Sequence, residues 1–330
     1  MYKNFKTSTQ IENILKEQGA QRVHELAIQT GLSKQRIHRV LLALLEEKKI
    51  KRIGKAPRVF YLLNEELNAV NEPGNIPVAK TSFLEKHFLF IRETGERQNG
   101  PEGMITWCMR QKLPLEKTID EFIAARKKYL AYFNNQGLIS GMEKLKTTKS
   151  FSSIGPDEMY YLDFYSIERF GKTRLGTLLH FAKQGQNKNL MNELVEEISP
   201  AIHQLIKREK TDAVAFIPPT IKREVQMMKF LEKKLALPLP HIKIAKVSGE
   251  IVVPQKALSR IEDRIINAKS TLFPMEAGNF QHILLIDDAI GSGASVNETA
   301  LKLKEKNPKA KITALAVTGS YKGFEVISEV

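Results

Sequence analysis

The stretch HILLIDDAIGSGAS, residues 282–295, decides the fold of the C-terminal part of this chain. Its first five residues are typical of a buried strand, and that strand ends in Asp287-Asp288. Adjacent carboxylates repel each other and are seldom buried, so the pair is best explained by contact with ligand hydroxyls or with a cation. The loop that follows the pair consists almost entirely of small residues.

This loop has the composition of an anion-binding segment. Its backbone N–H groups are open to close approach, two serines can donate hydroxyl hydrogen bonds, and the helix expected from Val296 onward directs its positive end at the same point. Ligands of open α/β sheets bind at the carboxyl ends of the strands. The sequence therefore predicts a sugar-phosphate site, with the phosphate held by Gly291, Ser292, Gly293, Ala294 and Ser295. A solvated strand-to-helix turn is the alternative.

Strand-like and helix-like segments alternate around this motif. Strand-like runs occupy residues 213–217, 241–247, 282–288 and 311–318, and helical stretches occur near 221–235 and 296–306. This alternation predicts an α/β domain over residues 159–330, with a doubly wound parallel sheet.

The N-terminal residues 1–63 have a different organisation. Helical segments at 8–18, at about 23–30 and from Ser33 onward precede a predicted hairpin, which is the layout of a winged helix-turn-helix. Residues 64–82 are polar, contain two prolines and a glycine, and are predicted to be a linker. Residues 83–158 are predicted to be a mostly helical region, and they contain no chemical motif.

Positive charge is concentrated in the N-terminal module. The whole chain of 330 residues has 51 Lys and Arg against 37 Asp and Glu, and residues 1–63 have 13 against 5, a net charge of +8. Such an excess favours contact with nucleic acid, although protein contact or dimerisation is an alternative use of this module. The predicted DNA-binding residues are Lys34, Gln35, Arg36, His38 and Arg39 on the third helix, with Lys55 and Arg58 on the hairpin.

The composition also excludes several classes of protein. The single cysteine, Cys108, rules out an intramolecular disulfide, and no Cys/His cluster has the spacing of a structural zinc site. No apolar run approaches the length of a membrane span, and the N-terminus lacks the apolar core of a signal peptide. We therefore expect a cytoplasmic protein without a membrane partner, and we also expect a homo-oligomer.

Residues 283–295 resemble the signature that binds 5-phosphoribosyl 1-pyrophosphate (PRPP) in type I phosphoribosyltransferases. In that family the two acids contact the ribose hydroxyls and the loop holds the 5′-phosphate. The resemblance implies that Asp287 and Asp288 bind ribose and that the loop from Gly291 to Ser295 binds phosphate.

The loop departs from the family pattern in two respects. Gly291 stands where Thr is usual, and serines replace Thr at positions 292 and 295. The purine-salvage branch has an acidic base within this loop, whereas Ile290 and Gly291 supply none. This difference disfavours purine salvage and favours ligand binding slightly over turnover.

A second resemblance concerns ComF-like competence phosphoribosyltransferases and covers roughly residues 160–330. It rests on a spaced set of residues, Gln255, Leu258, Arg264, Asn267 and Phe273, and on the segment 216–226. The resemblance implies a pyrophosphate loop with Pro219, Thr220, Lys222 and Arg223, and a flexible loop with Gln255, Arg264 and Asn267. Mg²⁺ would arrive with PRPP and bridge its pyrophosphate, so no all-protein metal site is expected.

Three functions fit these features. The first is a regulator or DNA-gated effector, in which a DNA-binding module is joined to a domain that binds PRPP or a nucleotide. The second is an active phosphoribosyltransferase or nucleotide-cleaving enzyme. Resemblance to the effectors of bacterial antiphage systems, including retrons, implies a reverse transcriptase–DNA complex as the partner of such an enzyme. The third is a ComF-like role in handling single-stranded DNA.

Overall fold

The computed structural model describes residues 2–55, 58–64, 76–221, 223–275 and 278–321. It divides into two compact units, Met1–Asn75 and Ile76–Val330. Each unit has its own hydrophobic core, so each is described by itself.

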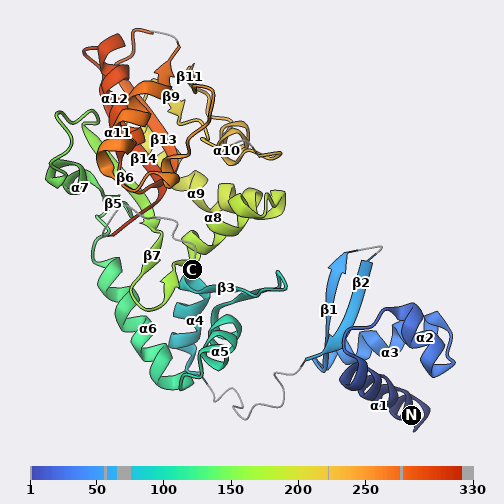
Figure 1. The fold of residues 1–330 in the computed structure, drawn as a ribbon. Helices are drawn as coiled ribbons and strands as arrows, with labels where there is room; N and C mark the ends of the chain where they lie inside the picture. Colours follow the sequence, from blue (N-terminus) through green and yellow to red (C-terminus); the bar gives the residue numbers. More distant parts are fainter. Residues whose placement is uncertain (1, 56–57, 65–75, 222, 276–277, 322–330) are drawn as a thin grey trace. The chain divides into compact units, whose positions relative to one another are not determined.

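The N-terminal unit consists of three helices followed by a hairpin (Figure 1). Its elements are α1 (Tyr2–Gln18), α2 (Val23–Thr30), α3 (Lys34–Glu46), β1 (Ile50–Lys55) and β2 (Arg58–Leu63). The two strands are antiparallel, with Ile50 opposite Leu63. The predicted order of helices and strands is confirmed in this unit.

Helix α3 begins where the sequence predicts. Ser33 is its N-cap, and the Ser33 side chain accepts a hydrogen bond from the Arg36 backbone N–H. Gly31 ends α2 with a φ of 67°, a left-handed conformation that glycine adopts without strain. Apolar residues one helical turn apart, including Ile37, Leu41 and Leu44, form the core of the unit.

A six-stranded sheet organises the second unit, with the strand order β10-β9-β13-β14-β6-β5. Its strands are β5 (Ile139–Ser140), β6 (Glu158–Phe164), β9 (Ala213–Phe216), β10 (His241–Ile242), β13 (His282–Ile290) and β14 (Lys311–Gly319). All neighbouring strands are parallel except β5, which is antiparallel to β6. The prediction of a largely parallel α/β sheet is therefore confirmed, and β6 is a strand that we did not predict.

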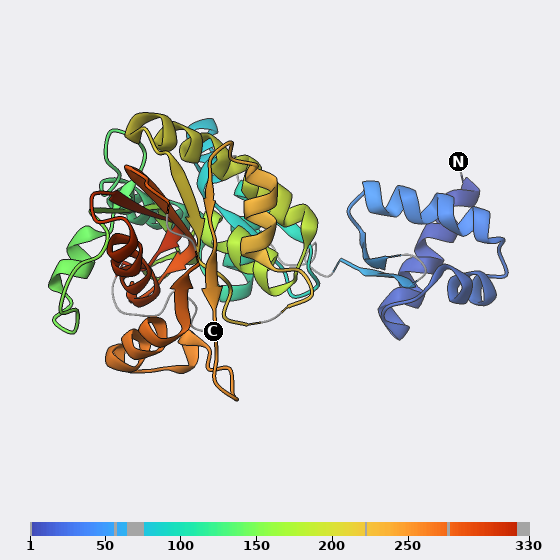
Figure 2. The same ribbon diagram turned by 90° about the horizontal axis from the view of Figure 1, so that it is seen from above.

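Helices cover both faces of this sheet, as Figure 2 shows from above. On one face, Val214 and Leu284 pack with α8 (Arg174–Gln184), α9 (Lys188–Glu209) and α10 (Met227–Leu235). On the other face, Ala215 and Leu285 pack with α11 (Ile261–Thr271) and α12 (Ala294–Lys306). Successive strand residues point to opposite faces, so the continuous apolar run 283–286 serves both cores.

The region predicted as helical joins this same unit. It contains α4 (Val78–His87), β3 (Leu89–Ile91), β4 (Arg97–Asn99), α5 (Gly100–Gln111), α6 (Leu115–Leu130) and α7 (Met142–Thr147). Strand β5 of this region extends the central sheet, and Cys108 packs in the core that α12 also lines. The region thus shares a sheet and a core with residues 159–330.

A buried ion pair also connects this region with the sheet. The Arg126 guanidinium of α6 donates two hydrogen bonds to the Asp163 carboxylate of β6, with N–O distances of 2.9 and 2.7 Å. Both side chains are less than a tenth exposed. His87 of α4 lies beside the pair, and burial together with the Arg126 charge lowers the pKa of His87 to about 4.

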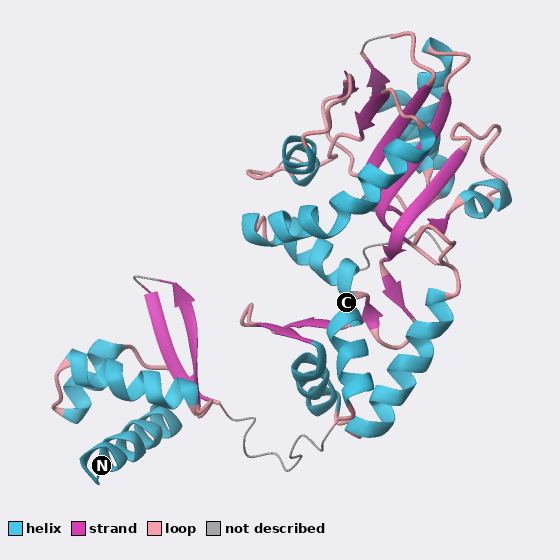
Figure 3. Ribbon diagram, turned by 180° about the vertical axis from the view of Figure 1, so that it is seen from behind, coloured by secondary structure: helices cyan, strands magenta, loops and turns pink. Residues whose placement is uncertain are grey.

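Short two-stranded ribbons complete the unit (Figure 3). They pair β3 with β4, β7 (Ser166–Ile167) with β8 (Gly171–Lys172), and β11 (Ile244–Lys246) with β12 (Leu272–Pro274).

Across the ranges that the structure describes, no helix is both long and apolar enough to span a bilayer.

Candidate ligand site

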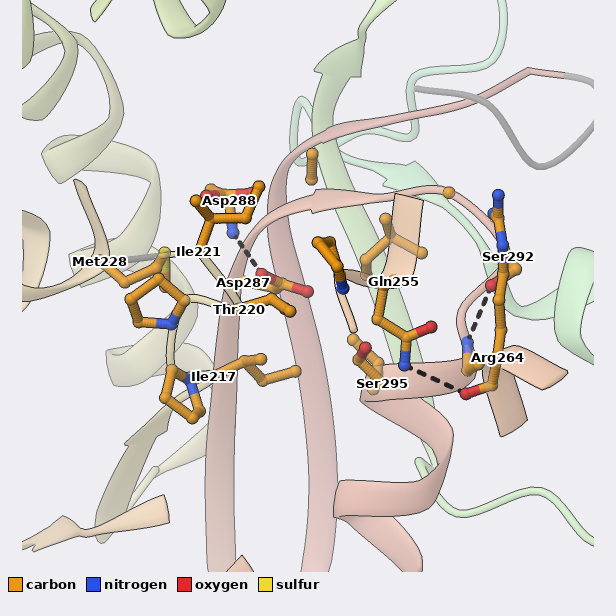
Figure 4. Close-up of a pocket in the computed structure, with 18 of the residues that line it drawn as sticks. Ile217, Thr220, Ile221, Met228, Gln255, Arg264, Asp287, Asp288, Ser292 and Ser295 are labelled. Carbon is orange, nitrogen blue, oxygen red and sulfur yellow. Dashed lines mark hydrogen bonds between the residues drawn. The ribbon is translucent and has the colours of Figure 1, made fainter. Parts of the chain in front are cut away.

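A cavity of about 230 Å³ lies at the carboxyl ends of β9 and β13 (Figure 4). It brings together segments that are far apart in the sequence. These segments are Ile217–Ile221 after β9, the loop after β13, and the end of α8 with Lys183 and Gln184. Gln255 and Arg264 also line the cavity. The position agrees with the rule that ligands of parallel sheets bind beyond the carboxyl ends of the strands.

Asp287 and Asp288 both line this cavity, but their surroundings differ. The Lys183 ammonium of α8 contacts both carboxylate oxygens of Asp288, at 2.9 and 2.6 Å. Asp288 itself is only 6% exposed. A cationic partner offsets the cost of holding this carboxylate away from water. Lys183 is not among the residues predicted from the sequence, because its partner lies 105 residues further along the chain.

The pKa of Asp287 is shifted by its surroundings. Burial raises the pKa of the Asp287 carboxyl, and the neighbouring Asp288 charge raises it further, whereas Lys183 opposes the rise. The Asp288 backbone N–H donates to the Asp287 carboxylate at 2.8 Å. An acidic group whose pKa is raised inside a cavity is a common feature of functional sites.

The loop after β13 is tightly built. Gly293 has a φ of 85°, and a Cβ at this position would lie 2.5 Å from the Leu145 Cδ2 atom of α7. Helix α12 begins at the next residue, so its free backbone N–H groups face the loop. The Ser320 backbone N–H donates to the Ile290 carbonyl at 3.1 Å and holds the start of the loop against the end of β14.

All five predicted phosphate-binding residues line the cavity. Gly291, Ser292, Gly293, Ala294 and Ser295 form its wall next to the two aspartates. Ser292 accepts a hydrogen bond from the Ala294 N–H at 3.4 Å, which leaves the hydroxyl hydrogen of Ser292 available to a ligand. The arrangement suits an anion bound at the N-terminus of α12.

Three of the four predicted pyrophosphate residues belong to the same cavity. Pro219, Thr220 and Arg223 line the cavity, and the Arg223 guanidinium donates to the Gln184 side chain at 2.8 Å. Lys222 lies outside the described residues. Arg223 is thus a fixed cation beside the cavity, where it can also face a phosphate.

The three residues predicted on a flexible loop lie instead on short helices. Gln255 is in η2 (Gln255–Ala257), and Arg264 and Asn267 are in α11. The Gln255 amide donates to the Arg264 carbonyl at 3.0 Å, and the Arg264 Nε donates to the Leu258 carbonyl at 2.6 Å. These bonds fix η2 against α11. Gln255 and Arg264 line the cavity, whereas Asn267 is not among its lining residues.

The described residues hold no cluster of three or more His, Cys, Asp or Glu side chains that could hold a metal ion by themselves. Asp287 and Asp288 supply carboxylate oxygens, which are suitable ligands for Mg²⁺. A magnesium ion in this cavity would take the rest of its ligands from phosphate oxygens and water.

The candidate DNA-binding residues of α3 lie on one side of that helix. Lys34, Gln35, His38 and Arg39 are exposed and Arg36 is half-buried, whereas Ile37 and Val40 between them are buried. The side chains of Lys55 and Arg58 lie outside the described part of the chain. The exposed face of α3 is therefore basic and polar at its N-terminal end.

No protein-family model and no curated protein sequence matches this chain.

Proposed function

We propose that the second unit is a domain similar to type I phosphoribosyltransferases of the ComF-like subgroup and that it binds PRPP or a nucleotide with Mg²⁺. One observation supports this proposal most strongly. A single cavity is lined by the Asp287-Asp288 pair, by the small-residue loop at the start of α12, and by Arg223 and Arg264. Hydroxyl-binding acids, phosphate-binding N–H groups and cations are what a phosphorylated ribose requires.

The N-terminal unit is proposed to be a winged helix-turn-helix module that binds DNA. Support comes from the order of its elements and from the polar and basic face of α3. A recognition helix presents the residues of its first turns to the major groove, and Lys34, Gln35 and Arg39 occupy such positions.

Together the two units would form a ligand-responsive regulator or a DNA-gated effector. Binding is favoured over turnover because the loop after β13 has no acidic residue and because Lys183 already neutralises Asp288. Three candidate partners can be compared in binding tests, namely duplex operator DNA, a reverse transcriptase–DNA complex and single-stranded DNA. The partner that binds most tightly would identify the DNA target.

An active glycosyltransferase is the second candidate. The observation that favours it is the raised pKa of the Asp287 carboxyl, because a carboxyl that titrates closer to neutrality is suited to general acid or base catalysis. Cleavage of PRPP would also rest on holding the ribose in position and on stabilising its positive charge.

Calorimetric titration of the full chain with PRPP and Mg²⁺ tests the proposal. We expect saturable binding, and we expect the Asp287→Asn/Asp288→Asn double variant to bind at least about tenfold more weakly. Glu305→Gln, at the exposed end of α12, is the matched control and should bind as the wild type does. If neither PRPP nor any ribonucleotide binds, both ligand hypotheses are wrong.

A pyrophosphate-release assay then separates the two candidates. Release that depends on Asp287 would establish an enzyme, whereas tight binding without release would leave a sensor.

A further inference from the structure

A second cavity, of about 410 Å³, lies between the start of α7 and the end of β14. It shares no lining residue with the first cavity. Its walls combine aromatic rings with hydrogen-bonding groups, and the residues used below are Tyr132, Lys144, Tyr161, Phe164, Ser320 and Tyr321. The proposed PRPP site makes no use of this cavity.

The aromatic wall of the second cavity is an ordered cluster. Phe164 and Tyr321 pack edge to face, with ring centroids 5.5 Å apart, and Tyr132 packs against both. The hydroxyls of Tyr132 and Tyr321 lie 2.6 Å apart. Rings fixed in this way offer a preformed surface to another flat ring.

A buried hydroxyl also lines this cavity. Tyr161 is 2% exposed, yet its hydroxyl has no hydrogen-bond partner among the described residues. Two glycines make room for the side chain. A Cβ at Gly141 would lie 2.6 Å from the Tyr161 hydroxyl, and a Cβ at Gly319 would lie 2.3 Å from its ring. A buried donor without a partner is costly, so this hydroxyl is suited to a ligand oxygen.

Lys144 adds positive charge to the lining of the second cavity. The Lys144 ammonium donates to the Ser320 hydroxyl. Burial lowers the pKa of Lys144 to about 8, and the nearby Arg264 charge contributes to that shift. A bound anion would raise the pKa of Lys144, because it would stabilise the charged form of the amine. Glu143 at the rim is exposed, so water screens its repulsion.

We propose that this second cavity binds a planar aromatic carboxylate. The ring would pack on Tyr132, Phe164 and Tyr321, and the carboxylate would accept hydrogen bonds from Lys144 and Tyr161. The site lies directly behind the loop of the first cavity, because the Ser320 hydroxyl donates to the Gly291 carbonyl at 3.3 Å and Leu145 packs under Gly293.

Benzoate is the probe for this site. The full chain is titrated with benzoate to about 10 mM, well above the millimolar Kd expected for so small a ligand, and binding is followed by ligand-observed NMR. We expect saturable binding, with cyclohexanecarboxylate at least about threefold weaker because it lacks a flat ring. Equal binding of the two acids, or binding of neutral uracil in place of benzoate, would contradict the proposed ligand class.

Two variants assign the binding to this cavity. Lys144→Gln should weaken benzoate binding about tenfold, and Tyr161→Phe, which removes only a hydroxyl, should weaken it about threefold or more. Lys146→Gln is the matched control, because Lys146 is exposed on the same helix and does not line the cavity. Wild-type affinity in a folded Tyr161→Phe or Lys144→Gln protein would overturn the site.

The titration contains no PRPP, so its result is independent of the proposed PRPP site. A second titration in the presence of saturating PRPP and Mg²⁺ should leave saturable benzoate binding in place. Complete competition together with unchanged benzoate binding by Lys144→Gln would place benzoate in the first cavity and would overturn the second site.

Discussion

The two units of this protein build their candidate sites in opposite ways. In the N-terminal unit, the DNA-binding candidates are neighbours on one helix, exposed to solvent above a core that the same helix helps to form. In the second unit, the cavity is assembled from residues of α8, β13, α11 and the segment after β9. The first kind of site depends on local structure, and the second depends on contacts between distant parts of the chain.

The largest effect should follow from breaking a long-range contact of the second unit. Asp163→Asn removes the charge that faces Arg126 and leaves a buried guanidinium without its counter-ion. We expect a loss of about 3–5 kcal/mol in the free energy of unfolding. Chemical denaturation checks this loss, and the transition of the N-terminal unit should stay unchanged. Equal losses in both units would contradict the division into independent cores.

A smaller effect is expected at the N-terminal site. The triple variant Lys34→Ala/Arg36→Ala/Arg39→Ala should bind duplex DNA about tenfold to a hundredfold more weakly, with a salt dependence reduced by about three ions. Fluorescence anisotropy at several salt concentrations measures both quantities. Lys16→Ala/Lys48→Ala/Lys49→Ala removes the same charge from exposed positions off α3 and is the control. Equal DNA affinity of the two triple variants would argue against α3 as the recognition helix.

The sequence predicted the local features well for a physical reason. The strand, loop and helix of residues 282–306 follow one another directly, and the N-cap at Ser33 acts within three residues. Composition and spacing determine such features. The pairing of Lys183 with Asp288 and of Arg126 with Asp163 joins residues that only the folded sheet brings together. No short pattern in the sequence marks these partners.

Two elements differed from expectation for related reasons. Strand β6 contains the charged residues Glu158 and Asp163, so its sequence does not look like that of a buried strand. Asp163 is nevertheless buried, because Arg126, which is distant in the sequence, neutralises its charge. Arg264 was expected on a flexible loop, yet it lies in α11, where its side chain is 8% exposed and bonded to the Leu258 carbonyl. Resemblance to a family motif pointed to Arg264 as a site residue, but it did not predict that this residue lies in a helix.

A third change, Ser33→Ala, tests the local character of the N-terminal unit. Loss of the N-cap hydrogen bond to the Arg36 N–H should lower the free energy of unfolding of this unit by about 1 kcal/mol. Thermal unfolding followed by circular dichroism measures this loss. Ser33→Asp restores an N-cap acceptor and should recover the stability, whereas failure of both variants alike would point to a role for Ser33 outside the cap.

The smallest effect concerns pH. The pKa of Asp287 is raised in the folded protein, so the native state holds this proton more tightly than the unfolded state does. The free energy of unfolding of the second unit should therefore fall as pH rises from the ordinary aspartate pKa through the raised one. Because the side chain is half-buried, we expect a change of about 1 kcal/mol or less.

Denaturation of the wild type and of Asp287→Asn across this pH range tests the expectation. The variant cannot ionise at this position, so its stability should depend less steeply on pH. The same steep fall in the variant would mean that another group titrates.

The most direct test of a ligand-responsive DNA-binding protein is the affinity of the full chain for DNA with and without PRPP and Mg²⁺. The DNA is a duplex selected by this protein from a random-sequence pool, and the salt concentration is held constant. We expect a change of at least about fivefold in the Kd for DNA, with the same factor in the Kd for PRPP when DNA is added. If PRPP and DNA both bind and neither changes the affinity for the other, the two units act separately and the protein is not a ligand-responsive DNA-binding protein.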